Sequence, residues 1–142
     1  MIREFKKSDL KDVMQIWRDT NIQAHSFISE EYWTDNYEAV KEMMPQAEVY
    51  VYENDSDDRI EGFIGLTDSY IAGIFVRDGA QSKGIGKRLL DYAKRIKSSL
   101  ELGVYQKNVR AICFYQREGF MLQSENIDED TGERELVMTW SR

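Results

Sequence analysis

The chain has 142 residues, the length of one ordinary domain, and its composition, 42% hydrophobic and 32% charged, is too apolar for a disordered protein. A formal net charge of -7 argues against general binding to nucleic acid, which needs a cationic surface, but it would attract a cationic partner such as an amine. No apolar run is long enough to span a membrane, and the N-terminus lacks the apolar stretch of a signal peptide. We therefore expect residues 1–142 to form a single domain that acts in the cytoplasm, without nucleic acid or membrane as a partner.

Disulfide and metal chemistry have little basis in this sequence. Its one cysteine, Cys113, cannot form an internal disulfide framework, and we expect it to be a buried free thiol. Because zinc sites are built from several cysteines and histidines, a chain with one of each is not expected to hold a metal.

Apolar spacing predicts one strand and two helices at the N-terminal end. Residues 1–5 form the strand. Ser8 can cap the first helix and Ser29 the second, and Pro45 follows the end of the second. The apolar positions that recur on one face are Leu10, Val13, Met14 and Trp17 in the first helix, and Tyr32, Trp33, Tyr37, Val40 and Met44 in the second.

A hairpin and a central strand come next. Residues 47–53 and 59–66 alternate as strands on either side of the polar turn 54–58, so they are expected to pair antiparallel. After the turn 67–69, residues 70–76 are apolar on both faces, which indicates a strand in the middle of a sheet.

The C-terminal part follows a glycine-containing loop at residues 77–84. The order of its elements, together with those before it, predicts an α/β or α+β domain around one mixed sheet. The elements are a helix with Ile85, Leu89, Ala93 and Ile96 on one face, a strand 100–105, a helix 109–118 ended by Gly119, and a hairpin of 120–124 and 135–140 about the turn 128–132.

The loop before this helix has the features of an anion site. The first turn of a helix offers free backbone N–H groups and the positive end of the helix dipole. Gly84 and Gly86 lack a Cβ and would let phosphates approach, and Lys83 and Lys87 add positive charge. A glycine pair alone is equally compatible with a structural turn.

Two nucleotide-binding motifs fail on spacing. Gly79 and Gly84 are spaced as in a Walker loop, but Ile85 stands where that loop requires lysine. Leu89 stands where the third glycine of a dinucleotide fingerprint belongs, and the loop follows antiparallel strands rather than opening a βαβ unit.

The amino-acid sequence of the loop matches a motif of a known family. Gln81–Gly86 resembles the Q/R-x-x-G-x-G/A motif of the GNAT (GCN5-related) N-acetyltransferases, and residues 74–76 resemble the end of that family's central strand. Asn108 followed by Ala111–Phe120 resembles the family's next block, an asparagine and then A-x-x-F-Y-x-x-x-G-F. The resemblance covers essentially the whole chain and is greatest to small bacterial members of the family.

The resemblance implies the family's fold, a mixed, mostly antiparallel, twisted sheet of about seven strands with about four helices. The central parallel strands 70–76 and 100–105 would splay apart, and acetyl-CoA would lie in the gap as cosubstrate. The contacts that the resemblance implies for this cosubstrate are Ile74, Phe75, Val76, Gln81, Ser82, Lys83, Gly84, Ile85, Gly86, Lys87 and Asn108.

The implied chemistry is acyl transfer to an amine. Tyr115 would protonate the leaving thiolate, because a phenol is protonated at neutral pH. A backbone N–H near Val76 would stabilise the oxyanion. The group that deprotonates the amine stays open among His25, Asp68, Glu31 and an ordered chain of water.

The residues that would bind the acceptor are the part of the site that the sequence defines least. His25, Tyr70 and Asp68 are candidates to line it, although a structural role suits each of them too. We expect a primary amine acceptor, most of all a protein lysine. The alternatives are a small-molecule amine (an amino acid, polyamine or amine-bearing toxin) and an acyl-CoA-binding module without catalysis. The protein is expected to be a monomer or a homodimer.

Overall fold

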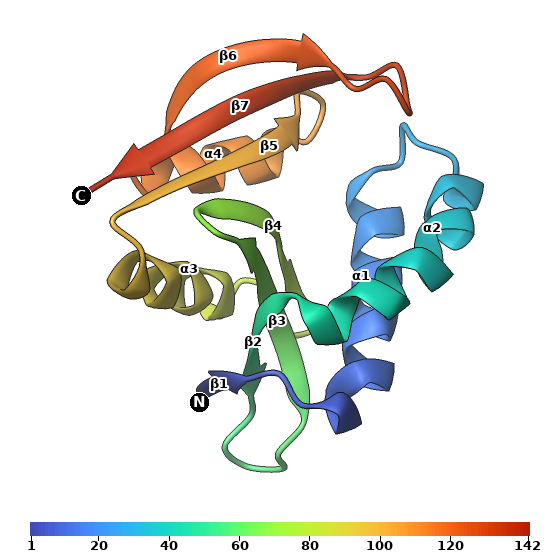
Figure 1. Cartoon of the computed structure of the whole chain (residues 1–142), viewed down its shortest axis with the longest axis vertical. Helices are drawn as coiled ribbons and strands as arrows, with labels where there is room; N and C mark the ends of the chain where they lie inside the picture. The colour runs from blue at the N-terminus through green and yellow to red at the C-terminus, as the bar shows by residue number, and fades with distance from the viewer.

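Seven strands form one continuous sheet, around which the computed structural model places all 142 residues (Figure 1). The order across the sheet is β1-β2-β3-β4-β5-β7-β6, and every neighbouring pair is antiparallel except β4 and β5. The predicted mixed, mostly antiparallel sheet is therefore confirmed. The strands are β1 (Ile2–Glu4), β2 (Glu48–Glu53), β3 (Ile60–Thr67), β4 (Tyr70–Val76), β5 (Ser99–Tyr105), β6 (Met121–Ile127) and β7 (Arg134–Ser141).

Helices cover both faces of the sheet and create two apolar cores. The helices are α1 (Leu10–Ala24), α2 (Glu30–Met43), α3 (Ile85–Ile96) and α4 (Val109–Arg117). The α1 and α2 helices pack on one face, over a core that includes Val13 and Phe63, and α3 and α4 pack on the other, over Leu89 and Leu102 (Figure 1). No helix of this fold combines the length and the apolar composition that crossing a membrane requires.

The parallel strands β4 and β5 part soon after they meet. Each has seven residues, but only two residue pairs form between them, and the last joins Ile71 to Leu102. A shift of register against β3 leaves Ala72 as an extra residue in β4, and such a bulge bends a strand. The predicted splay between these strands is confirmed, and it opens a gap in the middle of the sheet.

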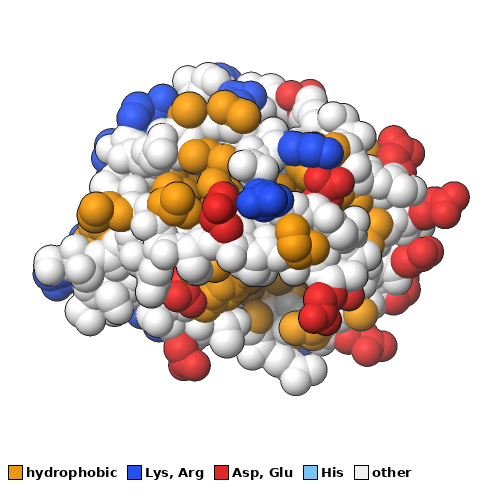
Figure 2. Space-filling model, turned by 90° about the horizontal axis from the view of Figure 1, so that it is seen from above, with side chains coloured by type: hydrophobic (Ala, Val, Ile, Leu, Met, Phe, Trp, Pro, Cys, Tyr) orange, Lys and Arg blue, Asp and Glu red, His pale blue; other side chains and the backbone are white.

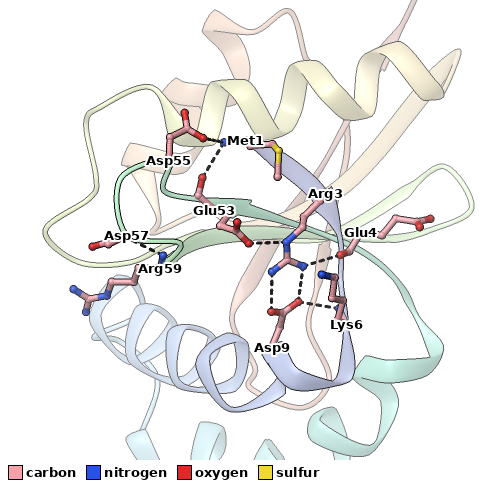
Figure 3. Close-up of polar contacts among 9 residues, drawn as sticks. All are labelled: Met1, Arg3, Glu4, Lys6, Asp9, Glu53, Asp55, Asp57 and Arg59. Carbon is pink, nitrogen blue, oxygen red and sulfur yellow. Dashed lines mark hydrogen bonds and ion pairs between the residues drawn. The ribbon is translucent and has the colours of Figure 1, made fainter.

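A buried ion pair holds the start of α1 against the edge of the sheet (Figure 3). The Arg3 guanidinium on β1 donates to both carboxylate oxygens of Asp9, at 2.9 and 3.0 Å, and to Glu53 at 2.7 Å. Asp9 is 6% exposed and also accepts the N–H of Lys6 at 2.8 Å. Burial acts to raise the pKa of Asp9, but these hydrogen bonds and the Arg3 charge outweigh burial and lower it. Because this network forms a 3-10 turn ahead of α1, the predicted cap Ser8 lies inside that turn and does not cap the helix.

Of four other local predictions, two are confirmed and two are wrong. Ser29 caps α2 as predicted, and Gly119 has the left-handed φ of 93° that ends the α4 region. Ile96 was expected on the apolar face of α3, but it is the last residue of the helix and is 43% exposed. Cys113 is exposed rather than buried, because the opposite face of α4 packs on the core.

Candidate active site

Backbone groups at the end of β4 face the gap. The N–H of Arg77 donates to the carbonyl of Glu61 at 2.7 Å, so residue 77 is bonded to β3. Because the bonding side alternates along a strand, Ile74 and Val76 turn their N–H and C=O groups away from β3 and toward the gap. An extended molecule in the gap could therefore pair with this edge as an added strand does.

Three of the predicted cofactor residues have protein partners of their own. The Phe75 backbone faces β3, and its ring stacks on Phe63 with 4.8 Å between centroids. The Gln81 side-chain amide donates to the Val76 carbonyl at 3.0 Å, which ties the loop to the end of β4. Ile85 is 4% exposed and belongs to the core under α3. These side chains shape the site from inside the protein, so any contact of residues 81 and 85 with a ligand would come through the backbone.

The loop between β4 and α3 ends in a free helix start. Gly79, Ser82 and Gly84 have φ values of 88°, 65° and 84°, in the left-handed region that favours glycine. The first helical bond runs from the N–H of Arg88 to the carbonyl of Gly84, at 3.0 Å. The N–H groups of residues 85–87 therefore have no partner within the helix, and together with the helix dipole they form a site for an anion.

Cationic side chains surround this helix start unevenly. Lys83 is exposed in the loop, and Arg110 of α4 donates to the Ser82 hydroxyl at 3.1 Å. Lys87 points the other way, since it forms an ion pair with Glu118 at 3.1 Å. Of the two lysines predicted at the rim, Lys83 is thus the one whose ammonium is not already paired with a carboxylate.

Two tyrosines, Tyr115 and Tyr70, lie on opposite faces of the sheet and close enough for one to affect the pKa of the other. Tyr115 of α4 is 8% exposed and lies against the rings of Phe114 and Phe120, at 5.2 and 5.5 Å between centroids. Burial raises the pKa of Tyr115, and the nearby Tyr70 hydroxyl raises it further. Tyr70, at the start of β4, is 41% exposed, and burial also raises its pKa. Tyr115 therefore keeps its proton at neutral pH and could donate it.

His25 and Asn108 join the two halves of the site. Asn108 caps α4 by accepting the N–H of Ala111 at 3.3 Å, and its amide group lies 3.4 Å from Nε2 of His25. The other ring nitrogen, Nδ1, lies 3.0 Å from the carbonyl of Asn21 in α1. Since a carbonyl only accepts, Nδ1 carries the proton and Nε2 accepts from Asn108. Burial lowers the pKa of His25, although the bond to Asn21 opposes this, and the ring stays neutral.

The remaining acceptor-side candidates lie further out. Asp68 is exposed in the turn between β3 and β4, with a left-handed φ of 54°, at the end of β4 opposite to the glycine loop. Glu31 is exposed in the first turn of α2, where its N–H donates to Ser29. No group of three or more His, Cys, Asp or Glu side chains is arranged to hold a metal ion.

Sequence reasoning missed Tyr105, which closes one side of the site. Its hydroxyl donates to Asp128 in the β6–β7 turn at 2.6 Å, and its ring contacts His25 and Phe27 at 5.2 and 5.7 Å. An aromatic residue that ends a strand directly before the Asn108 block could have drawn attention to this position. These contacts bring the β6–β7 turn against the connection between α1 and α2, as Figure 1 shows at the upper right.

With this geometry in place, comparison with known proteins identifies similar chains. A family model described as an acetyltransferase (GNAT) domain matches residues 45–122. The peptidyl-lysine N-acetyltransferase YiaC of Escherichia coli strain K12 is 33% identical over 142 residues, which cover 99% of this chain and 96% of the relative. The peptidyl-lysine N-acetyltransferase YjaB of Salmonella typhimurium strain LT2 is 28% identical, over 92% of this chain and 90% of the relative.

Solved structures agree with the fold. The solution structure of apo YjaB from Escherichia coli superimposes with a TM-score of 0.88 and 24% identity, covering 99% of this chain and 96% of that one. The structure of yncA, a putative acetyltransferase from Salmonella typhimurium with its cofactor acetyl-CoA, gives a TM-score of 0.67 and 19% identity, covering 99% and 92%.

The buried histidine predicts a pH dependence of stability that can be isolated. Because the folded-state pKa of His25 is lowered, the unfolded chain binds a proton first as the pH falls below about 6.5. The contribution of His25 is complete above that pH and is lost as the pH falls toward the folded-state pKa. The advantage in Tm of the wild type over His25→Gln should therefore shrink by about 2–4 °C between pH 7.5 and pH 5.5.

Thermal melts of both proteins at the two pH values test this. His25 is the only histidine, so no other imidazole titrates in that range. An advantage of equal size at both pH values would contradict the assignment of a neutral, hydrogen-bonded ring.

Proposed function

Because this chain belongs to the GNAT acetyltransferase family and is an acetyl-CoA-dependent N-acetyltransferase, we propose that it acetylates the amino group of protein lysines. The observation that carries the proposal is the identity of 33% along nearly the whole chain to YiaC, which is named a peptidyl-lysine N-acetyltransferase. We further propose that residues 1–142 act as one catalytic domain in the cytoplasm. One continuous sheet and a lone, exposed cysteine support these two points.

The proposed cosubstrate site follows the free backbone groups. The first turn of α3, with its unpaired N–H groups at residues 85–87, would hold the pyrophosphate, and Lys83 would add positive charge. The pantetheine arm would lie in the gap and pair with the backbone of Ile74 and with the second lone pair of the Val76 carbonyl, whose first accepts from Gln81. Asn108 would contact the arm with the part of its amide group that His25 and α4 leave free. The Phe75 ring would support this edge from beneath rather than bind.

The proposed reaction is a direct attack of the amine on the thioester. The acceptor ammonium first loses a proton, since a lysine amine is mostly charged at neutral pH. The nitrogen lone pair then attacks the carbonyl carbon, and the N–H of Val76, which faces the gap, stabilises the oxyanion. The bond from carbon to sulfur breaks, and Tyr115 gives its proton to the thiolate. The products are an acetylated amine and free CoA.

A panel of acceptors tests the proposed substrate. Purified protein with acetyl-CoA is offered lysine-containing peptides, polyamines, free amino acids and an amine-bearing toxin. Release of CoA thiol is followed together with product mass. We expect acetylation of the lysine side chain in peptides at a higher kcat/KM than for any small amine. Acetylation of small amines alone would contradict the lysine assignment, and binding of acetyl-CoA with no CoA release would favour a binding module.

Gly84→Ala and Gly79→Ala form a matched pair that tests the pyrophosphate site. Both glycines have a left-handed φ, and an added Cβ would meet no atom within 4 Å at either position. Each variant should lose about 1 kcal/mol of stability through backbone strain. Only Gly84 adjoins the helix start, so only Gly84→Ala should raise the KM for acetyl-CoA, by about tenfold. An equal rise of the KM for acetyl-CoA in both variants would contradict a pyrophosphate site at the start of α3.

Tyr115→Phe tests the proton donor. The change keeps the packing against Phe114 and Phe120 but removes the proton, so kcat should fall by about 100-fold or more while the KM for acetyl-CoA stays within twofold. Tyr50→Phe is the control, since Tyr50 is a buried tyrosine of the same core at 9% exposure. A kcat for Tyr115→Phe equal to that of the wild type would remove Tyr115 from the mechanism.

A further inference from the structure

A carboxylate of β7 lies over the backbone of β5 where the gap begins. Glu135 stands directly opposite Tyr105 in the β5–β7 pairing, so the two side chains share a face of the sheet. A Cβ built on the neighbouring Gly103 would lie 2.9 Å from Cδ of Glu135, and 3.0 and 3.2 Å from its two carboxylate oxygens. The absence of a side chain at Gly103 is therefore what lets this carboxylate reach its place.

This place is the closed end of the gap. Gly103 directly follows Leu102, the last residue of β5 that pairs with β4. Tyr70 on β4 pairs with Glu101, two residues before Gly103, and its hydroxyl lies close to the Gly103 backbone. Burial raises the pKa of Tyr70 most, and the charge of Glu135 raises it further. The charge of a deprotonated Tyr70 would in turn raise the pKa of Tyr115. Glu135 and the proposed proton donor Tyr115 thus both lie near Tyr70, on opposite faces of the sheet.

Glu135 has no cationic partner in the protein. It accepts one hydrogen bond, from the side chain of Asn126 at 3.3 Å. Two cations close in sequence to Glu135 and to its partner Tyr105 pair with other carboxylates, Arg134 with Glu125 at 3.8 Å and Lys107 with Glu133 at 3.0 Å. A half-buried carboxylate with one neutral hydrogen-bond donor and no counter-ion is only partly compensated for the hydration that it loses. That loss would be offset by a cationic ligand.

The surroundings favour a cation as well. Seen from above, acidic side chains gather along the right-hand edge of the molecule, where Figure 1 has the β6–β7 turn and the connection between α1 and α2 (Figure 2). This turn contains Asp128, Glu129 and Asp130, and the net charge of the chain is -7. A negative rim of this kind attracts cationic molecules toward the carboxylate behind it.

We propose that Glu135 binds the ammonium group of the acceptor and orients its nitrogen toward the thioester. This inference rests on the proposed function, because it concerns the acceptor of that reaction. Glu135 holds the ammonium by a charge-assisted hydrogen bond and selects acceptors that arrive as cations. The proton that the ammonium loses before attack passes to solvent rather than to Glu135. Gly103 keeps the space for it, and Tyr70 bounds the other side.

Glu135→Gln is the test, with Glu125→Gln as the matched control. Both positions are glutamates of the β6–β7 hairpin, and glutamine keeps the length of the side chain, but Glu125 is exposed and is paired with Arg134. The KM of the acceptor should rise by about 10–100-fold in Glu135→Gln, since bonds between charged groups contribute that much. The KM for acetyl-CoA should stay within twofold, and Glu125→Gln should match the wild type for both substrates.

Glu135→Asp supplies a second measurement that does not depend on the glutamine variant folding. Aspartate keeps the charge but draws it back by one methylene, so the acceptor KM should lie between those of the wild type and Glu135→Gln. A merely structural glutamate would instead lower Tm in both variants and leave the acceptor KM unchanged. An unchanged acceptor KM in either variant, measured with a working acceptor, overturns the proposal.

The acceptor used in this test separates the two proposals. If the wild type acetylates only a small amine, the lysine assignment fails, and a raised KM for that amine in Glu135→Gln still supports Glu135. If peptide lysine is the acceptor and its KM does not change, the lysine assignment stands and the role of Glu135 fails. If no amine releases CoA from the wild type, both proposals fail together.

Discussion

Two parallel strands that pair over only two residue pairs determine how this protein can work. A sheet normally satisfies its backbone groups by pairing along the full length of each strand, and unpaired groups that are removed from water are costly. Here the bulge at Ala72 bends β4 away from β5, so the groups of Ile74 and Val76 are left facing an opening. The opening therefore lies within the sheet itself, between two neighbouring strands that are not hydrogen-bonded along most of their length.

The proposed site draws on residues from both faces of the sheet. Tyr115 belongs to the core under α3 and α4, whereas Tyr70 and Glu135 lie on the face covered by α1 and α2. The two sides are held in register by polar contacts between residues far apart in sequence. The contact between His25 and Asn108 spans 83 residues and ties the end of α1 to the start of α4. The helix that carries Tyr115, the proposed proton donor, is therefore positioned in part by the helix pair on the other face.

Local patterns were enough to predict the elements and the glycine loop, because caps, turns and apolar spacing act over a few residues. The cap at Ser29 and the left-handed Gly119 are examples. Predictions failed where particular side-chain contacts, near or distant in sequence, decide the structure. Ser8 does not cap α1 because Arg3 and its partners build a turn there. His25 could be recognised as unusual, but its partner Asn108 lies on another element.

The acceptor side was the hardest to predict for the same reason. The sequence of β7 predicts a C-terminal strand but gives no sign of a functional residue in it. Glu135 comes to lie over Gly103 only through the pairing of β7 with β5. The backbone direction at Phe75 likewise depends on its register with β3. The motif residues could be predicted as a set, whereas the division of labour between their backbones and side chains required the fold.

The short pairing between β4 and β5 also divides the hydrogen bonding of the sheet. β5 pairs with β7 over seven residues and β6 adds to β7, so these strands are hydrogen-bonded to β4 only through a narrow seam, while the core under α3 and α4 packs across it. A molecule bound in the gap would bridge that seam with hydrogen bonds that the strands themselves do not make. Ligand binding should then slow amide hydrogen exchange on both sides of the seam, and the loaded enzyme would be the more completely folded one.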